Sequence, residues 1–113
     1  MALETNRLDQ RLFERFSAKF PAKFKDARED FGQNVHLEDA SAQGVRIASR
    51  QRLYVNDSVS LEVELPDGHA PMNLRGQVVW VKHNDTESWD AGLKFYKISL
   101  VAMSRLYKFA SPA

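Results

Sequence analysis

Two arginines near the start of the chain have the residue type and spacing of an anion clamp. Arg11 and Arg15 are four residues apart, so they share one face of a helix and also one side of an extended strand. A planar guanidinium can bind phosphate bidentately and can donate to O6 and N7 of guanine. The pair predicts a phosphate or guanine contact. On these residues alone, a solvated helix face partly neutralised by Asp9 and Glu14 is an equally good interpretation.

A second polar group, Asp39, Ser41 and Gly44, lies between two alternating apolar segments. Asp39 can accept hydrogen bonds from N1 and N2 of a guanine, while Ser41 and backbone N–H groups near Gly44 can contact ribose or phosphate oxygens. The same residues also suit a hairpin turn, because Asp and Ser bond to the backbone of a turn and glycine has no Cβ. Chemistry alone leaves ligand contact and a well-formed turn evenly balanced.

The remaining reactive residues form no catalytic or metal-binding motif. His36, His69 and His83 occur without an HExxH, GxSxG or glycine-rich phosphate-loop pattern. The absence of cysteine excludes thiolate chemistry, disulfides and Cys-ligated zinc. His83, Asp85, Glu87 and Asp90 could form a metal cluster, but they are interpreted as polar residues of a solvated hairpin whose loop runs from His83 to Ser88. We therefore expect no enzymatic activity, no catalytic residue, no metal and no cofactor.

Charge and hydropathy restrict the possible partners. The chain has 113 residues with a net charge of +1, from 16 Lys+Arg and 15 Asp+Glu. Residues 1–25 carry six basic and three acidic groups, a net of +3, and the other 88 carry ten and twelve, a net of −2. Bulk attraction to DNA is weak, so an anion site must be local. With no apolar run near the ~20 residues that span a bilayer and no secretory signal, we expect a cytoplasmic protein that inserts in no membrane.

The hydrophobic pattern predicts the elements that position these residues. Leu3 to Phe16 has a weak helical stripe, and at about fourteen residues it is marginal as an isolated helix, so we expect a partly ordered arm. Period-two segments indicate half-buried strands, and the Val78–Val81 run suggests a strand buried on both faces, with Trp80 in the core. Ile98 to Phe109 returns to helical period after a Ser99 cap. The strand segments contain Phe20–Phe24, Val35–Leu37, Val45–Ile47, Val59–Leu65, Leu74–Lys82 and Trp89–Phe95.

Six short strands with hairpin spacing and a terminal helix predict a small antiparallel barrel of mainly β structure. Pro66-Asp67-Gly68 is expected to be a turn, with the glycine at positive φ. Pro21 suits the edge or the start of a strand. We expect one domain, divided into an arm over residues 1–16 and a barrel with its C-terminal helix over 17–113.

The order of these motifs resembles the PilZ domain family over roughly residues 11–109. Arg11 and Arg15 match its arginine motif, and Asp39, Ser41 and Gly44 match its second motif. The Gly76-Gln77-Val78-Val79-Trp80 and Gly92-Leu93-Lys94-Phe95 segments also have counterparts in that family. Either motif alone is weak, but both in this order are fairly specific.

The resemblance implies a six-stranded barrel that binds cyclic di-GMP, a bacterial second messenger. It implies that a flexible arm carrying Arg11 and Arg15 wraps the ligand against the face that bears Asp39, Ser41 and Gly44, and that a downstream protein partner receives the signal. Arg7 with Arg11, or Arg15 with Lys19, also fits the arginine spacing. The sequence gives neither the partner, the ligand stoichiometry nor the oligomeric state.

Two other functions remain open. A PilZ-like adaptor can work through protein contacts alone, without the ligand. A small barrel can also bind single-stranded RNA or DNA through a basic arm and exposed aromatics such as Trp80 or Trp89, although the slightly acidic body of the chain disfavours this.

Overall fold

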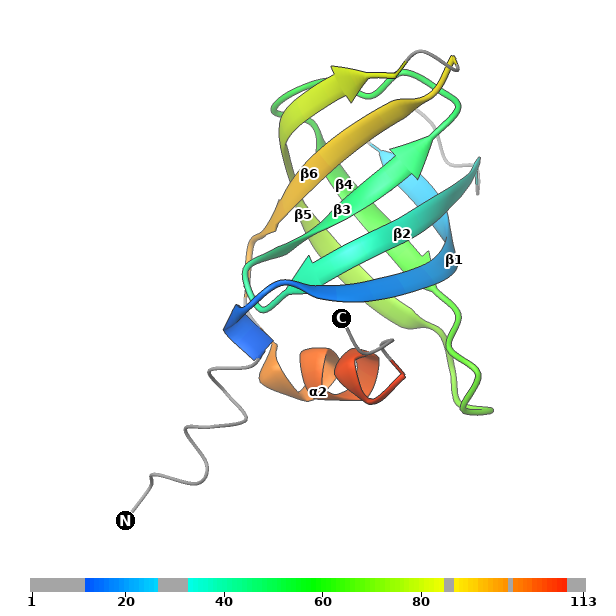
Figure 1. Ribbon diagram of the computed structural model, residues 1–113, viewed down its shortest axis with the longest axis vertical. Helices are drawn as coiled ribbons and strands as arrows, with labels where there is room; N and C mark the ends of the chain where they lie inside the picture. Colours follow the sequence, from blue (N-terminus) through cyan, green and yellow to red (C-terminus); the bar gives the residue numbers. More distant parts are fainter. Residues whose placement is uncertain (1–11, 27–32, 85–86, 98, 110–113) are drawn as a thin grey trace.

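In the computed structural model, which describes residues 12–26, 33–84, 87–97 and 99–109, six antiparallel strands close into a barrel and a helix follows (Figure 1). Around the barrel the order is β1-β2-β3-β6-β5-β4, and β4 pairs with β1 to complete the ring. The predicted six-stranded antiparallel barrel with a C-terminal helix is confirmed. The elements are β1 (Phe16–Asp26), β2 (Gln33–Ser41), β3 (Gly44–Ser49), β4 (Ser58–Val63), β5 (Met72–His83), β6 (Trp89–Phe95) and α2 (Leu100–Lys108).

Alternating side chains build the core of the barrel. In β4, Val59, Leu61 and Val63 are buried, whereas Glu62 between them is exposed. Burial of this apolar surface is the main stabilising contribution to the fold. Alternating positions of the other strands also supply buried residues, which include Ala22, Phe24, Val35, Leu37, Val45, Ile47, Leu74, Val78, Ala91 and Leu93.

Strand β1 shows how a proline is accommodated. Pro21 lies in the middle of β1, opposite His36 of β2. The pairing of β1 with β4 begins only at Ala22. At Pro21, β1 is therefore paired with β2 on one edge and has no strand partner on the other edge. A residue without a backbone N–H is tolerated at such a position.

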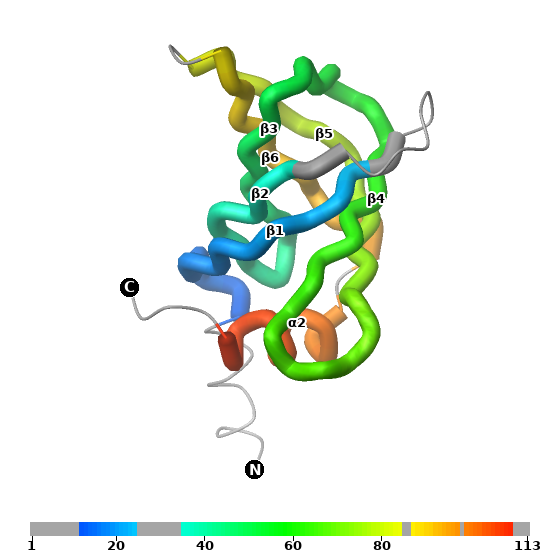
Figure 2. The backbone as a smooth tube through the Cα atoms, turned by 90° about the vertical axis from the view of Figure 1, so that its right-hand side faces the viewer, coloured from blue at the N-terminus to red at the C-terminus, as the bar shows by residue number. Residues whose placement is uncertain are grey.

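Helix α2 lies across one end of the barrel (Figure 2). The Ser99 side chain accepts a hydrogen bond from Ala102 N at 3.2 Å, which confirms the predicted cap. Met103 and Leu106 are buried, and the Phe16 and Tyr107 rings meet edge to face at 5.1 Å. Val101 is apolar but 84% exposed, on the side of the helix that faces away from the barrel.

The β4–β5 hairpin is clamped to α2. Its turn at Pro66-Asp67-Gly68 is confirmed, with Gly68 at a φ of 73°. Asp67 Oδ2 accepts from Arg105 Nε at 2.6 Å and Oδ1 accepts from Arg105 Nη2 at 2.9 Å. This fork-to-carboxylate pair holds the pKa of Asp67 far below its usual range. It fixes α2 against the end of the barrel.

Candidate functional site

A two-residue turn joins β2 to β3 and carries the second polar motif. Ser41 pairs with Gly44, and Ala42 and Gln43 form the turn between them. Ser41 Oγ accepts a hydrogen bond from Gln43 N at 3.2 Å, and the Ser41 residue is only 3% exposed. The interpretation as a hairpin turn and the interpretation as a ligand contact are therefore compatible, because the residues that could contact a ligand also build the turn.

Arg15 lies over this turn. Its Nη2 is 2.8 Å from Asp39 Oδ1, and its Nη1 donates to Gly44 O at 3.4 Å. The Arg15 side chain is 51% exposed and that of Asp39 is 22% exposed. Asp39 Oδ1 is a buried atom that receives no hydrogen bond of good geometry from the described residues, so its contact with Arg15 is an ion pair alone. The structure therefore brings Arg15, Asp39, Ser41 and Gly44 together, and Arg11 lies outside the described residues.

Arg46 is a neighbour of this site that our sequence interpretation missed. It lies opposite Asp39 on β3, and its Nε donates to Asp39 Oδ2 at 2.7 Å. Its Nη1 is 3.5 Å from Asp90 Oδ2 on β6. The hydrogen bond to Asp39 is the main reason that the pKa of Arg46 is raised. Arg46 thus orients the carboxylate of Asp39 and leaves its Oδ1 facing Arg15.

The glycine at the start of β3 is required by strand packing. A Cβ on Gly44 would overlap the carbonyl oxygen of Leu93, 3.1 Å from its carbonyl carbon. On the same side of the turn, Phe95 N donates to Gln43 O at 2.9 Å. Strands β3 and β6 can therefore approach closely only if residue 44 has no side chain.

Trp80 is on the barrel surface, so the prediction that it lies in the core was wrong. The pairing of β5 with β6 shifts between Val78 and Trp80, and this bulge makes Val79 and Trp80 both point outward. Trp80 is 39% exposed and Val79 is 45% exposed. The indole lies over Gly92, where a Cβ would collide with it.

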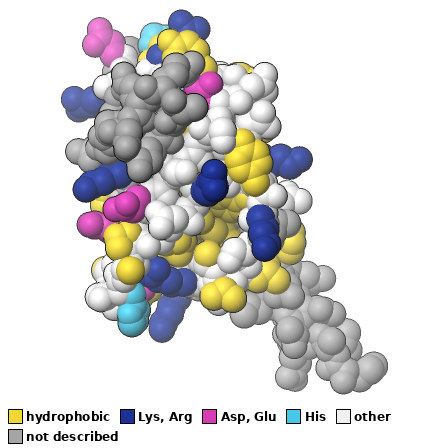
Figure 3. Space-filling view, turned by 180° about the vertical axis from the view of Figure 1, so that it is seen from behind, with side chains coloured by type: hydrophobic (Ala, Val, Ile, Leu, Met, Phe, Trp, Pro, Cys, Tyr) yellow, Lys and Arg dark blue, Asp and Glu magenta, His cyan; other side chains and the backbone are white. Residues whose placement is uncertain are grey.

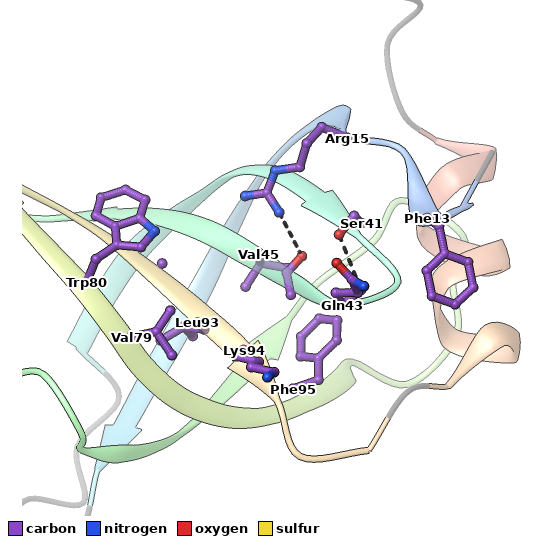
Figure 4. A pocket seen from close by; sticks show the side chains of 12 residues that line it. Phe13, Arg15, Ser41, Gln43, Val45, Val79, Trp80, Leu93, Lys94 and Phe95 are labelled. Atoms are coloured by element: carbon purple, nitrogen blue, oxygen red, sulfur yellow. Dashed lines mark hydrogen bonds between the residues drawn. The ribbon is translucent and has the colours of Figure 1, made fainter. Parts of the chain in front are cut away.

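A pocket of about 500 Å³ connects Trp80 to the polar turn (Figure 4). Its lining combines two cations, a buried hydroxyl, strand backbone and aromatic side chains of two kinds, Trp and Phe. The described residues that line it are Phe13, Arg15, Ser41, Gln43, Gly44, Val45, Val79, Trp80, Gly92, Leu93, Lys94 and Phe95. The pocket can hold a flat, anionic molecule, because Arg15 and Lys94 supply positive charge and Trp80 supplies a ring face.

The segment just before Arg15 is attached to the barrel. Leu12 is 1% exposed, and its carbonyl accepts a hydrogen bond from Ala42 N of the turn. Phe13 is 42% exposed and borders the pocket. Within four residues, the chain therefore places Leu12 in the core, Phe13 at the edge of the pocket and Arg15 over the turn.

The other predicted features place no competing site on the described part of the chain. No three His, Cys, Asp or Glu side chains of the described residues gather as metal ligands. None of the described helical segments is long and apolar enough to cross a bilayer. On the face turned away from the viewer in Figure 1, the Lys and Arg side chains of the described residues are dispersed and form no continuous stripe (Figure 3).

Comparison with known proteins agrees with this geometry. No curated protein matches the chain. The Bacillus subtilis inhibitor of motility MotI/DgrA has a similar structure, with a TM-score of 0.61 at 15% sequence identity. The match covers 84% of this chain and 46% of the MotI/DgrA chain, so this chain spans less than half of that protein. At this identity, the likeness shows a shared fold.

The family is shown by a sequence model. The PilZ domain model matches residues 9–110, which include Arg15, the turn and all six strands. Domains of this family are binding and adaptor modules of the kind that binds cyclic di-GMP. The chain belongs to the PilZ domain family.

Proposed function

We propose that this protein binds cyclic di-GMP in the pocket beside the β2–β3 turn and acts as a receptor or adaptor. One observation carries the proposal. Arg15, from the first family motif, lies 2.8 Å from Asp39 and 3.4 Å from Gly44 of the second motif, at the rim of a pocket of about 500 Å³. Because Asp39 lies 24 positions after Arg15 along the chain, the fold is what brings the two motifs together.

Each residue at the turn has a chemical role in this proposal. Arg15, with Arg11, grips a phosphate and the O6 and N7 edge of a guanine. Asp39 Oδ1 accepts from guanine N1 and N2, which would satisfy an atom that receives no hydrogen bond from the described residues. Ser41 and the backbone around Gly44 contact ribose or phosphate oxygens.

The aromatic wall gives the pocket a preference for a base. Trp80 is held over Gly92 and the residue is 39% exposed, so its indole is preorganised for stacking. Stacking of a base on an aromatic side chain contributes about 1–3 kcal/mol. Lys94 adds a positive charge at the pocket wall. A cyclic dinucleotide presents both flat bases and phosphates, which this lining complements.

Leu12 gives a route by which ligand binding changes the arm. A guanine that pairs with Asp39 would draw Arg15 from its present ion pair. Leu12 precedes Arg15 by three residues, and its carbonyl oxygen accepts a hydrogen bond from Ala42 N of the turn. A new position of Arg15 therefore acts on Leu12 and repositions the chain that precedes Arg15. We infer that this change is detected by a downstream protein partner, that the chain catalyses no reaction, and that it acts in the bacterial cytoplasm.

Isothermal titration with cyclic di-GMP tests the proposal. The wild-type protein should bind at micromolar ligand or tighter, whereas poly-deoxythymidylate should give no saturable heat. Arg15→Ala removes a charged hydrogen-bond partner and should cost about 2 kcal/mol or more, roughly a 30-fold higher Kd. Arg75→Ala, which removes an exposed arginine of β5 outside the pocket lining, is the matched control and should bind normally.

The melting temperature of Arg15→Ala shows whether Arg15 is a ligand-binding residue or a structural one. Because the Arg15 side chain is half exposed, its ion pair contributes little to folding, on the order of 1 kcal/mol or less. A large loss of stability with normal ligand binding would contradict the proposed role of Arg15.

A PilZ adaptor that uses no ligand is the second candidate. It is favoured by the pairing of Arg15 and Arg46 with the same Asp39 carboxylate, because such a network also suits a purely structural role. No heat with cyclic di-GMP at micromolar concentration, in a protein that is folded, would support this adaptor against the receptor.

A further inference from the structure

The end of the barrel opposite α2 carries an ordered cluster of aromatic and cationic side chains. The β3–β4 loop and the β5–β6 hairpin meet at this end (Figures 1 and 2). Arg52 Cζ lies 5.1 Å from the Tyr54 ring centroid and 5.4 Å from that of Trp89. His83 stacks on Trp89 with centroids 4.2 Å apart and ring planes at 25°. We call Arg52, Tyr54, Val55, His83 and Trp89 the rim cluster.

The charge of Arg52 is held in place by two aromatic rings. Three other arginines, Arg15, Arg46 and Arg105, each pair with an aspartate. Within the described ranges, no carboxylate lies within ion-pair distance of Arg52. Aromatic faces attract a guanidinium without cancelling its charge, so its planar donor fork remains able to bind a carboxylate bidentately.

The loop that presents Arg52 is fixed by hydrogen bonds within it, by a buried side chain and by a hydrogen bond to β5. At its start, Ser49 Oγ accepts from Gln51 N at 3.1 Å and donates to Gln51 O at 3.0 Å. Leu53, in the middle, is 4% exposed. At its end, Asn56 N donates to Val78 O at 2.7 Å, and Asn56 takes a φ of 76° that asparagine tolerates. A partner that binds here loses little free energy in ordering the loop.

The other side of the rim cluster is equally defined. His83 and Trp89 are directly opposite each other in the β5–β6 ladder, and such cross-strand aromatic pairs stabilise each other. Tyr54 is 45% exposed and Val55 is 50% exposed. Trp, Tyr and Arg are the residue types that dominate binding energy at protein interfaces. The rim cluster thus combines two aromatic walls, an aliphatic neighbour and an available cation.

We propose that the rim cluster is a docking site for an acidic segment of a partner protein, in which Arg52 binds a carboxylate and Tyr54, Val55 and Trp89 contact the adjacent apolar side chains. Charge favours a peptide over a nucleic acid. The β5–β6 hairpin that carries Trp89 also carries the exposed carboxylate of Glu87, which disfavours a chain of several phosphates nearby, whereas one carboxylate needs to reach only Arg52. The site lies at the opposite end of the barrel from α2, so docking does not depend on the pocket at the turn.

The test uses the full chain and two matched probes. A short fluorescein-labelled peptide of alternating glutamate and leucine is titrated up to millimolar concentration, and its glutamine counterpart is the uncharged control. Fluorescence anisotropy reports binding, and amide and indole chemical shifts locate it. We expect saturable shifts at Arg52, Tyr54, Val55 and the Trp89 indole with the glutamate peptide only.

Variants assign the effect to Arg52. Arg52→Gln should weaken binding of the glutamate peptide by about three- to tenfold, as for the loss of one partly exposed charge pair. The affinity of Arg52→Lys should lie between that of the wild type and that of Arg52→Gln. Arg75→Gln and Arg15→Ala should leave the affinity for the glutamate peptide unchanged. Because Arg15→Ala alters only the pocket at the turn, the peptide result is independent of the outcome of the cyclic di-GMP titration. The proposal is overturned by equal binding of both peptides, by tighter binding of poly-deoxythymidylate at the rim cluster, by an Arg52→Gln variant that binds as wild type, or by no saturable binding.

Discussion

Replacing Gly44 with alanine tests the close approach of β3 to β6 on which the site depends. The new Cβ would overlap the Leu93 carbonyl oxygen and lie 3.3 Å from Lys94 Cα. Both neighbours are backbone atoms, so no side-chain rotation relieves the overlap and the strands must separate. Overpacking of this kind costs about 1–3 kcal/mol. Separation also weakens the Phe95 N to Gln43 O hydrogen bond of 2.9 Å, at about 1 kcal/mol.

The expected loss for Gly44→Ala is therefore about 2–4 kcal/mol, out of roughly 5–15 kcal/mol for a domain of ordinary stability. Urea denaturation followed by tryptophan fluorescence measures it directly. In a thermal scan, the melting temperature should fall by about 8–16 °C, taking about 4 °C per kcal/mol at this size.

Gly68→Ala is the matched control for this change. Gly68 has a φ of 73° and no heavy atom within 4 Å of its ideal Cβ. Its replacement strains the backbone alone and should cost about 1 kcal/mol. If Gly44→Ala is no less stable than Gly68→Ala, the packing argument for Gly44 is refuted.

Three further changes test other parts of the structure. Leu12→Ala removes a side chain that is 1% exposed, so the free energy of unfolding from urea titration should fall by about 2–4 kcal/mol; a smaller loss than about 1 kcal/mol would mean that Leu12 is not anchored. Gly92→Ala should push the Trp80 indole off β6 and shift its fluorescence to the red in a Trp89→Phe background; unchanged emission would contradict the contact. Arg105 lowers the pKa of Asp67, so this pair stabilises the folded protein above about pH 4 and its contribution is lost as the pH falls below that. The unfolding free energy of the wild type should then decline more steeply between about pH 4 and 2 than that of Asp67→Asn, and parallel curves would rule out the pair as the cause.

The barrel could be predicted because most of its strand segments alternate, and β4 shows this most clearly. Val59, Leu61 and Val63 face the core and their neighbours face outward, which is the period that a half-buried strand requires. The Ser99 cap and the Gly68 turn were also predictable, since each depends on local backbone chemistry. These features are set by residues close together in the chain.

Trp80 shows where a periodic pattern fails. The bulge between Val78 and Trp80 turns two consecutive side chains outward. Bulges depend on how two strands pair across the sheet, so the run of apolar residues in β5 gave no sign of one. A prediction from alternation alone therefore placed a pocket-lining ring in the core.

The charged network around Asp39 was predictable in part. A two-residue turn at Ala42 and Gln43 places Asp39 directly opposite Arg46, so a hairpin drawn on the sequence could have found that pair. The contact between Arg15 and Asp39 is different, because it depends on how β1 curves around the barrel. Only the resemblance to PilZ domains linked those two residues before the structure did.

The most direct test of the proposed function is a cyclic di-GMP titration of the isotopically labelled wild-type protein, followed by NMR. The proposal predicts saturable shifts at micromolar ligand for the amides of Ser41, Gln43 and Gly44, the Arg15 side chain and the Trp80 indole, while the Trp89 indole at the far end stays unchanged. Saturable shifts that bypass the turn and Trp80, or none at all in a folded protein, would contradict it.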